Sequence, residues 1–107
     1  TPAKLGDTGW IDASSQAGLD RCFYRKVGNI VYVTLSSAGN KTIGASYTTV
    51  FTLPVGFRPS IAWNFVWQNL SNADSRQNGW INQSGTIELY SNTSKSYWYG
   101  STSFPVD

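Results

Sequence analysis

The sequence contains no histidine and no methionine, and it has a single cysteine among its 107 residues. Without histidine, the Ser-His-Asp and Cys-His schemes of nucleophilic catalysis are not available. Metal sites lack their usual His or multi-Cys ligands, so no metal and no other cofactor is expected. Cys22 has no second cysteine with which to form an internal disulfide. The domain therefore lacks the covalent cross-link that commonly stabilises small secreted domains.

Other absences restrict the organisation of the chain and its partners. An open reading frame begins with methionine, so the sequence is expected to be a piece of a longer protein. No run approaches the roughly 18 apolar residues of a membrane span, and no membrane insertion is expected. The formal charge is +2 with the basic residues scattered, which argues against nucleic acid as a partner. This length predicts one domain, residues 1–107, for which oligomerisation is an available source of stability.

Along the chain, side-chain character alternates with a period of two residues, as in β-strands. In "NIVYVTLSS", β-branched and aromatic residues stand on both faces, which is typical of a strand covered on both sides. "TIELYSN" is expected to send Ile87 and Leu89 inward and Glu88 outward. No segment shows a helical apolar stripe. Short strands separated by frequent turns predict an all-β fold, an antiparallel β-barrel or sandwich of about seven or eight strands.

Residues typical of turns separate these predicted strands. Gly28-Asn29 is predicted to form a two-residue hairpin, and Asn78-Gly79 is predicted to be a second turn, followed by a short strand that ends at Gln83-Ser84-Gly85. The connector "TLPVGFRPS" contains two prolines and a glycine, which predict a stiff corner between two sheets. Within it, Phe57 is expected to pack inward, with Arg58 held outward or against an aromatic ring.

Five stretches occur in the order "GDTGWIDA", "FYRKVGNIVYV", "TLPVGFRPS", "INQSGTIELYS" and "GSTSFPVD". In this order the chain resembles the C-terminal head domains of receptor-binding and tail-fibre proteins of siphophages that infect Gram-positive bacteria, lactococcal phages among them. The resemblance implies a homotrimer of β-barrel heads at the distal tip of the virion tail, bound to a host cell-wall or pellicle saccharide. It also implies contacts with other tail or baseplate proteins through a preceding N-terminal part. Asn78, Trp80 and Glu88 lie where that family tends to place ligand contacts.

The residues themselves agree with saccharide binding, because sugar sites combine flat aromatic rings with short polar side chains. A polar loop and the short strand after it form the first candidate patch, in which five residues cluster within seven positions: Asp74, Arg76, Gln77, Asn78 and Trp80. Trp80 fits the site and the core equally well. Trp98 lies between two tyrosines, so at least one face of that strand presents a ring to a ligand or an interface.

Other tryptophans have a structural interpretation. Trp63 and Trp67 alternate with polar positions and share a face with Phe65, which favours packing in the core or in a subunit interface. Trp10 is expected to plug the end of the barrel or to lie in an interface. Cys22 is expected to be a small buried apolar side chain.

Two other functions stay open beside the adhesin. A tail or baseplate module without a ligand would use its aromatic residues only to hold protomers together. A polysaccharide-degrading enzyme would need two facing carboxylates, for which Asp74 and Glu88 are the candidate pair. Both lie among polar residues that favour ordinary pKa values, so no enzymatic activity is expected.

Overall fold

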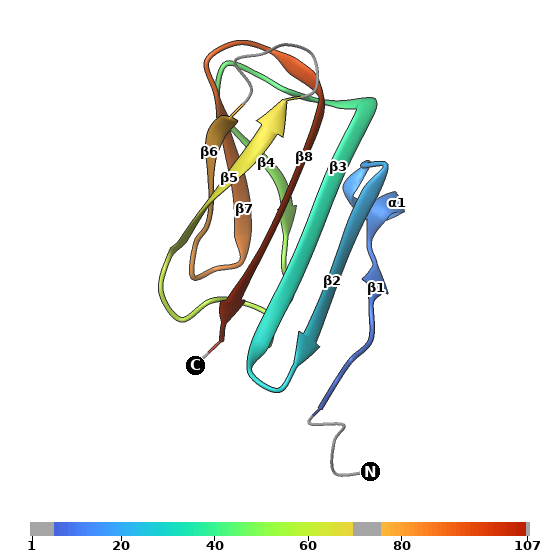
Figure 1. Ribbon diagram of the computed structural model, residues 1–107, viewed down its shortest axis with the longest axis vertical. Coiled ribbons are helices and arrows are strands. Elements are labelled where there is room, and N and C mark those ends of the chain that lie inside the picture. The colour runs from blue at the N-terminus through green and yellow to red at the C-terminus, as the bar shows by residue number, and fades with distance from the viewer. Residues whose placement is uncertain (1–5, 70–75, 107) are drawn as a thin grey trace.

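The computed structural model describes residues 6–69 and 76–106 and consists of one sheet of eight antiparallel strands with a single turn of helix (Figure 1). In chain order the elements are β1 (Ile11–Asp12), α1 (Ser14–Ala17), β2 (Arg21–Val27), β3 (Ile30–Ile43), β4 (Ser46–Thr52), β5 (Trp63–Asn69), β6 (Arg76–Ile81), β7 (Thr86–Ser91) and β8 (Lys95–Pro105). Across the sheet the order is β1-β2-β3-β8-β5-β6-β7-β4. The last strand therefore lies in the middle of the sheet.

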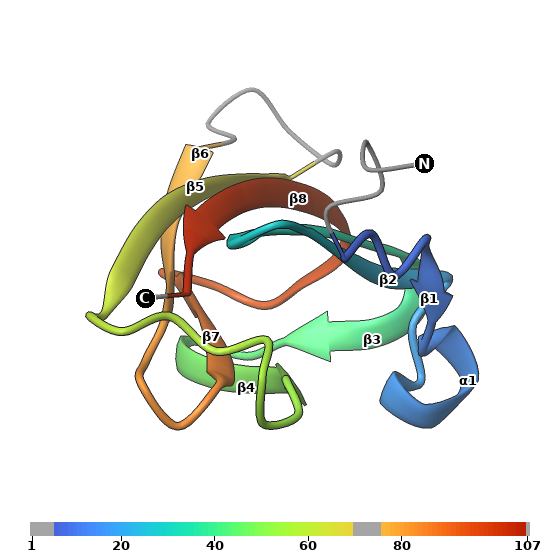
Figure 2. The ribbon, with the colours of Figure 1, turned by 90° about the horizontal axis from the view of Figure 1, so that it is seen from below.

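The sheet curls into a half-barrel, so that β4 faces β2 and β8 across the interior (Figure 2). The all-β prediction is confirmed. The predicted corner between two sheets is wrong, because β4 and β5, which the connector joins, belong to the same curled sheet. Curling buries the concave face and leaves the convex face of the sheet outward.

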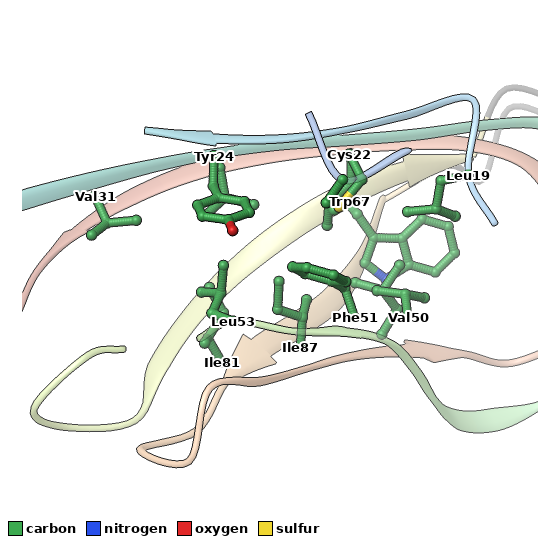
Figure 3. Packing of buried hydrophobic residues seen from close by; sticks show 14 of the residues in the cluster. Leu19, Cys22, Tyr24, Val31, Val50, Phe51, Leu53, Trp67, Ile81 and Ile87 are labelled. Atoms are coloured by element: carbon green, nitrogen blue, oxygen red, sulfur yellow. The ribbon is translucent and has the colours of Figure 1, made fainter. Parts of the chain in front are cut away.

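The concave face carries the hydrophobic core, shown in Figure 3. Side chains from β2 and β3 point toward those of β4, β6 and β7, and the ring centres of Tyr24 and Phe51 are 6.0 Å apart across the interior. The largest fully buried side chains are those of Trp67, Trp98 and Phe104. Cys22 is buried as predicted. The core closes the curled sheet without any contribution from a long helix.

Strand β3 shows which face of the sheet is covered. Val31, Val33 and Leu35 are buried, whereas Tyr32 between them is exposed. The prediction that this strand is covered on both faces is therefore wrong. Its β-branched and aromatic residues at outward positions make the sequence look like an interior strand although they lie on the convex surface.

Two of the predicted turns have different outcomes. Val27 pairs with Ile30, so Gly28-Asn29 is the expected two-residue hairpin, with Gly28 at a φ of 62°. Asn78-Gly79 is not a turn but part of β6. Gly79 is needed there because a Cβ would stand 2.9 Å from both the Phe65 ring and the Leu89 side chain.

The connector between β4 and β5 folds back on itself. The N–H of Phe57 donates to the carbonyl of Pro54 over 3.1 Å, and the Phe57 ring packs edge-on against Tyr24 with ring centres 4.9 Å apart. This confirms that Phe57 points inward. Arg58 was expected to point outward or to lie against an aromatic ring. Instead its Nε donates to the carbonyl of Leu53 over 2.8 Å and its side chain covers Gly85.

Trp67 joins two strands at the point where they separate. Strands β6 and β7 pair only from Gly79 to Ile81. Beyond that point the Trp67 Nε1 donates to the carbonyls of Asn78 and Tyr90, over 2.9 and 3.1 Å. One buried indole thus satisfies two backbone acceptors, which confirms the structural interpretation of Trp67.

Candidate functional site

Strands β6, β7 and β4 bring one group of aromatic residues together on the convex face. Trp80 pairs with Glu88 on β7, and Tyr90 on β7 pairs with Tyr47 on β4. The ring centres of Tyr47 and Trp80 are 4.8 Å apart, and those of Tyr47 and Tyr90 are 5.2 Å apart. We call Tyr47, Trp80, Glu88 and Tyr90 the aromatic shelf. Trp80 therefore lies at the surface rather than in the core.

The carboxylate of Glu88 belongs to the same surface. Its Oε1 accepts a hydrogen bond of 2.8 Å from the indole Nε1 of Trp80. This bond fixes the orientation of the indole and places a negative charge beside the rings. The sequence prediction grouped Trp80 with Glu88, and the structure does place them together.

The remaining predicted site residues are not all at the shelf. Asn78 is exposed on β6, two positions before Trp80. Its backbone pairs with Val66 on β5, the strand that neighbours β6 on the side opposite β7. Arg76 is at the start of β6, opposite Gln68, four positions along the strand from Trp80. Asp74 lies outside the described residues. The patch is therefore spread along β6.

Trp98 is a correction to the prediction. Its side chain has no exposed surface, and its Nε1 donates to the carbonyl of Lys41 over 2.9 Å. The register of β8 with β3 sets Trp98 opposite the buried Ser37. Trp98 points into the core, whereas its neighbours Tyr97 and Tyr99 are exposed. In this part of β8, the two tyrosine rings are therefore at the surface and the tryptophan ring is not.

A second convex surface lies on β2, β3 and β8, which are adjacent in Figure 1. Arg25 pairs with Tyr32, and Tyr32 pairs with Ser103. At the next outward position, two residues further along β3, Thr34 pairs with Ser101, and their hydroxyl oxygens are 3.0 Å apart. The outward side chains here are thus a tyrosine ring and three hydroxyls in adjacent rows.

Trp10 covers this surface from the segment that precedes β1. It borders a hollow of about 310 Å³ lined by Trp10, Tyr32, Val33, Thr34, Ser101, Thr102 and Ser103. An adjoining hollow of about 270 Å³ is lined by Trp10, Arg25, Val27 and Tyr32. We call the two hollows together the Trp10 groove. Trp10 and Tyr32 are 51% and 41% exposed, so both rings remain open to a ligand.

The position of Trp10 is fixed by an ion pair. The Asp7 carboxylate accepts from the N–H of Gly9 over 2.8 Å and from Nε of Arg25 over 2.9 Å. The Arg25 guanidinium carbon in turn lies 5.8 Å from the centre of the Trp10 ring. The hydrogen bond to Asp7 raises the pKa of Arg25. Because the two charges compensate each other, the groove suits an uncharged ligand better than an ion.

The acidic residues and the cysteine decide where a metal ion or a pair of catalytic carboxylates could be placed. Residues 6–69 and 76–106 contain no group of three or more His, Cys, Asp or Glu placed to hold a metal ion. The Asp74–Glu88 pair includes a residue outside these ranges, and Glu88 itself is hydrogen-bonded to Trp80. In the same ranges, no helix has the length and apolar character that crossing a membrane requires.

The sequence was also compared with known proteins. It matches no model of a protein family, and it has no significant match to a curated protein.

Sequence reasoning did not find the Trp10 groove. Trp10 was expected to plug the barrel end or to lie in an interface. The outward alternation of Tyr32 with Thr34, and of Ser101 with Ser103, was the available signal. That signal becomes useful only once β8 is known to pair with β3, because the four residues belong to strands about 70 positions apart.

Proposed function

We propose that this domain is the head of a phage receptor-binding protein, which attaches the virion to a cell-wall or pellicle saccharide of a Gram-positive host. We further propose that the sugar lies in the Trp10 groove. The observation that carries the proposal is the pair of open rings, Trp10 and Tyr32, beside the hydroxyls of Thr34, Ser101 and Ser103. The biological setting rests on the resemblance of the five ordered sequence stretches to siphophage heads.

The groove fits the chemistry of a sugar ring. The apolar C–H face of a pyranose stacks on an aromatic ring, and its hydroxyls need short donors and acceptors close by. Trp10 and Tyr32 offer the rings, and the hydroxyls at the floor come from rigid strands rather than loops. At about 310 Å³ the hollow is at the small end of ligand pockets, which suits one or two sugar units.

In this proposal the domain acts as a homotrimer at the distal end of the tail. Several weak sites on one particle then give firm attachment, so a shallow groove is sufficient. Light scattering of the purified domain at micromolar concentration tests the assembly, with a trimer as the expected result. A stable monomer would oppose this part of the proposal without bearing on sugar binding by a single groove.

Calorimetric titration with purified host-wall polysaccharide tests the binding site. Trp10→Ala is expected to reduce the affinity roughly ten-fold, because stacking on one ring is lost. Trp10→Phe keeps a ring and is expected to retain much of the affinity. Tyr97→Ala removes a comparably exposed ring of β8 outside the groove and serves as the matched control. If Trp10→Ala binds like the parent protein, the sugar does not use this groove.

The role in adhesion needs a separate assay. The purified domain is expected to compete with phage for host cells and to lower adsorption, whereas the Trp10→Ala variant is expected to compete poorly. A domain that binds no wall polysaccharide and leaves adsorption unchanged would favour the alternative, a structural tail or baseplate module. Release of reducing sugars by the purified domain would instead indicate a polysaccharide-degrading module.

A further inference from the structure

In the aromatic shelf, the rings of Trp80 and Tyr47 lie closer together than the spacing of their strands requires. Trp80 and Tyr47 belong to β6 and β4, which stand on either side of β7. Strands two places apart in a sheet are separated by roughly 10 Å, yet these ring centres are 4.8 Å apart. The two side chains therefore lean toward each other over β7, where Tyr90 joins them. The result is a continuous surface of three rings, with Tyr47 half exposed.

Glu88 gives this surface a negative charge. The described ion pair of the protein joins Arg25 and Asp7, and in residues 6–69 and 76–106 no lysine or arginine forms an ion pair with Glu88. Its carboxylate accepts a hydrogen bond from the indole N–H of Trp80. An indole that donates to a carboxylate becomes richer in π-electron density. Trp80 is thereby improved as a partner for a cation above its ring.

We propose that the aromatic shelf binds a quaternary ammonium group. Such a group spreads one positive charge over several methyls, is weakly hydrated, and contacts aromatic faces through those methyls. The adjacent Glu88 carboxylate adds charge complementarity that a neutral sugar face would not use. A primary ammonium would have to give up stronger hydration on this open shelf, so the methylated cation is the better match.

This site is independent of the saccharide proposal. The shelf is built on β4, β6 and β7, whereas the Trp10 groove is built on β2, β3, β8 and the segment before β1. The two surfaces also differ in charge balance. Arg25 compensates Asp7 in the groove, whereas no lysine or arginine of the described ranges forms an ion pair with Glu88 on the shelf. Binding of a cation at one and of a neutral sugar at the other can therefore be measured separately.

Choline chloride is the probe, with the Nε1–H resonance of Trp80 followed by NMR at constant ionic strength. A saturable shift with a dissociation constant on the order of millimolar is expected. The uncharged isostere 3,3-dimethyl-1-butanol has the same shape and is expected to bind at least roughly five-fold more weakly. Equal binding of both probes would overturn the proposal and indicate an apolar shelf, suited to the face of a sugar.

Variants separate the contributions of charge and ring. Glu88→Gln keeps an oxygen that accepts from the Trp80 indole but removes the charge, and roughly a five-fold loss of choline affinity is expected. Tyr47→Ala removes one face of the shelf and is expected to weaken binding similarly. Tyr97→Ala, on β8, is the matched control and is expected to leave choline binding unchanged.

Each result decides between the two sites. Unchanged choline affinity in both Glu88→Gln and Tyr47→Ala would exclude the shelf as the cation site. Trp10→Ala is expected to leave choline binding intact, so failure of the saccharide proposal does not affect this test. If choline instead shifts the Trp10 resonance and its affinity falls in Trp10→Ala, the cation binds in the groove and the proposal is wrong.

Discussion

The guanidinium of Arg25 lies over the ring of Trp10 and at the same time forms two hydrogen bonds with the Asp7 carboxylate. Three residues from two segments thus hold each other at the surface. Because Asp7 also accepts from the N–H of Gly9, the carboxylate shapes the backbone just before Trp10. The ring that borders the groove is positioned before any ligand arrives.

Asp7→Asn is expected to loosen Trp10 without unfolding the protein. The pair is partly exposed and screened by solvent, so the loss of stability should be small. The backbone dynamics of residues 7–10 and the Trp10 indole resonance, followed by NMR relaxation, should show increased motion. Glu88→Gln, a charge-removing change of the same kind on the shelf, should leave this segment unchanged. Unaltered relaxation in Asp7→Asn would mean that the ion pair does not position Trp10.

Trp67→Phe is expected to destabilise the fold by about 1–3 kcal/mol beyond the loss of ring volume. The substitution leaves the carbonyls of Asn78 and Tyr90 without the indole N–H they share. Trp98→Phe is the matched variant, because that indole is equally buried but serves one carbonyl, of Lys41. Urea unfolding should show the larger loss for Trp67→Phe. Equal losses would mean that the second acceptor contributes nothing.

Gly85→Ala and Gly56→Ala separate backbone strain from a steric clash. Both glycines have a positive φ, 89° and 97°. A Cβ at Gly85 would stand 2.6 Å from the carbonyl oxygen of Leu53, whereas a Cβ at Gly56 meets nothing within 4 Å. Gly56→Ala is expected to cost about 1 kcal/mol, the penalty for a side chain at this φ.

Gly85→Ala should cost at least about 2 kcal/mol more, because the Leu53 carbonyl cannot move without losing its hydrogen bond from Arg58 Nε. Thermal unfolding of the two variants provides the measurement. Similar melting temperatures would show that the connector relaxes around the added methyl group.

The Cys22 thiol is expected to be unreactive in the native protein. Burial, with a smaller contribution from the charge of Asp12, raises its pKa from 9.0 to about 12. The folded state therefore holds this proton more tightly than the unfolded state. Its contribution to stability is complete below pH 9.0 and declines as the pH rises toward about 12.

A thiol reagent at pH 8 provides the measurement. Modification of Cys22 should be slow in buffer and fast in denaturant, and its rate in buffer should follow the fraction of unfolded protein. Equal rates under the two conditions would show that the thiol is accessible in the folded state.

Much of the fold follows from local sequence signals. The alternation in "TIELYSN" places Ile87 and Leu89 in the core and Glu88 outside, as predicted, and Gly28-Asn29 forms its hairpin. The error at Asn78-Gly79 has a physical reason. Gly79 is required by the close approach of the Phe65 ring and not by a reversal of the chain, and sequence alone does not distinguish the two uses of glycine.

The candidate sites depend on information that is not local. Tyr97, Trp98 and Tyr99 have the right alternation, but only the pairing of Trp98 with Ser37 decides which side points inward. The Trp10 groove requires β1, β2, β3 and β8 to be adjacent. The resemblance named Trp80 and Glu88 together as candidate ligand contacts, and the two are neighbours across β6 and β7. The two tyrosines that complete the shelf come from the pairing of β7 with β4, which the prediction did not contain.

The central position of β8 has a consequence for synthesis on the ribosome. This strand is the only described element that hydrogen-bonds to both β3 and β5, so it joins the β1-β2-β3 half of the sheet to the β5-β6-β7-β4 half. A nascent chain that has not yet released Pro105 from the exit tunnel therefore carries two halves of the sheet that are not hydrogen-bonded to each other and have open strand edges. The sheet cannot be completed during translation until β8 has emerged. Stalled or prematurely terminated chains are therefore the forms that chaperones bind and that aggregate most readily.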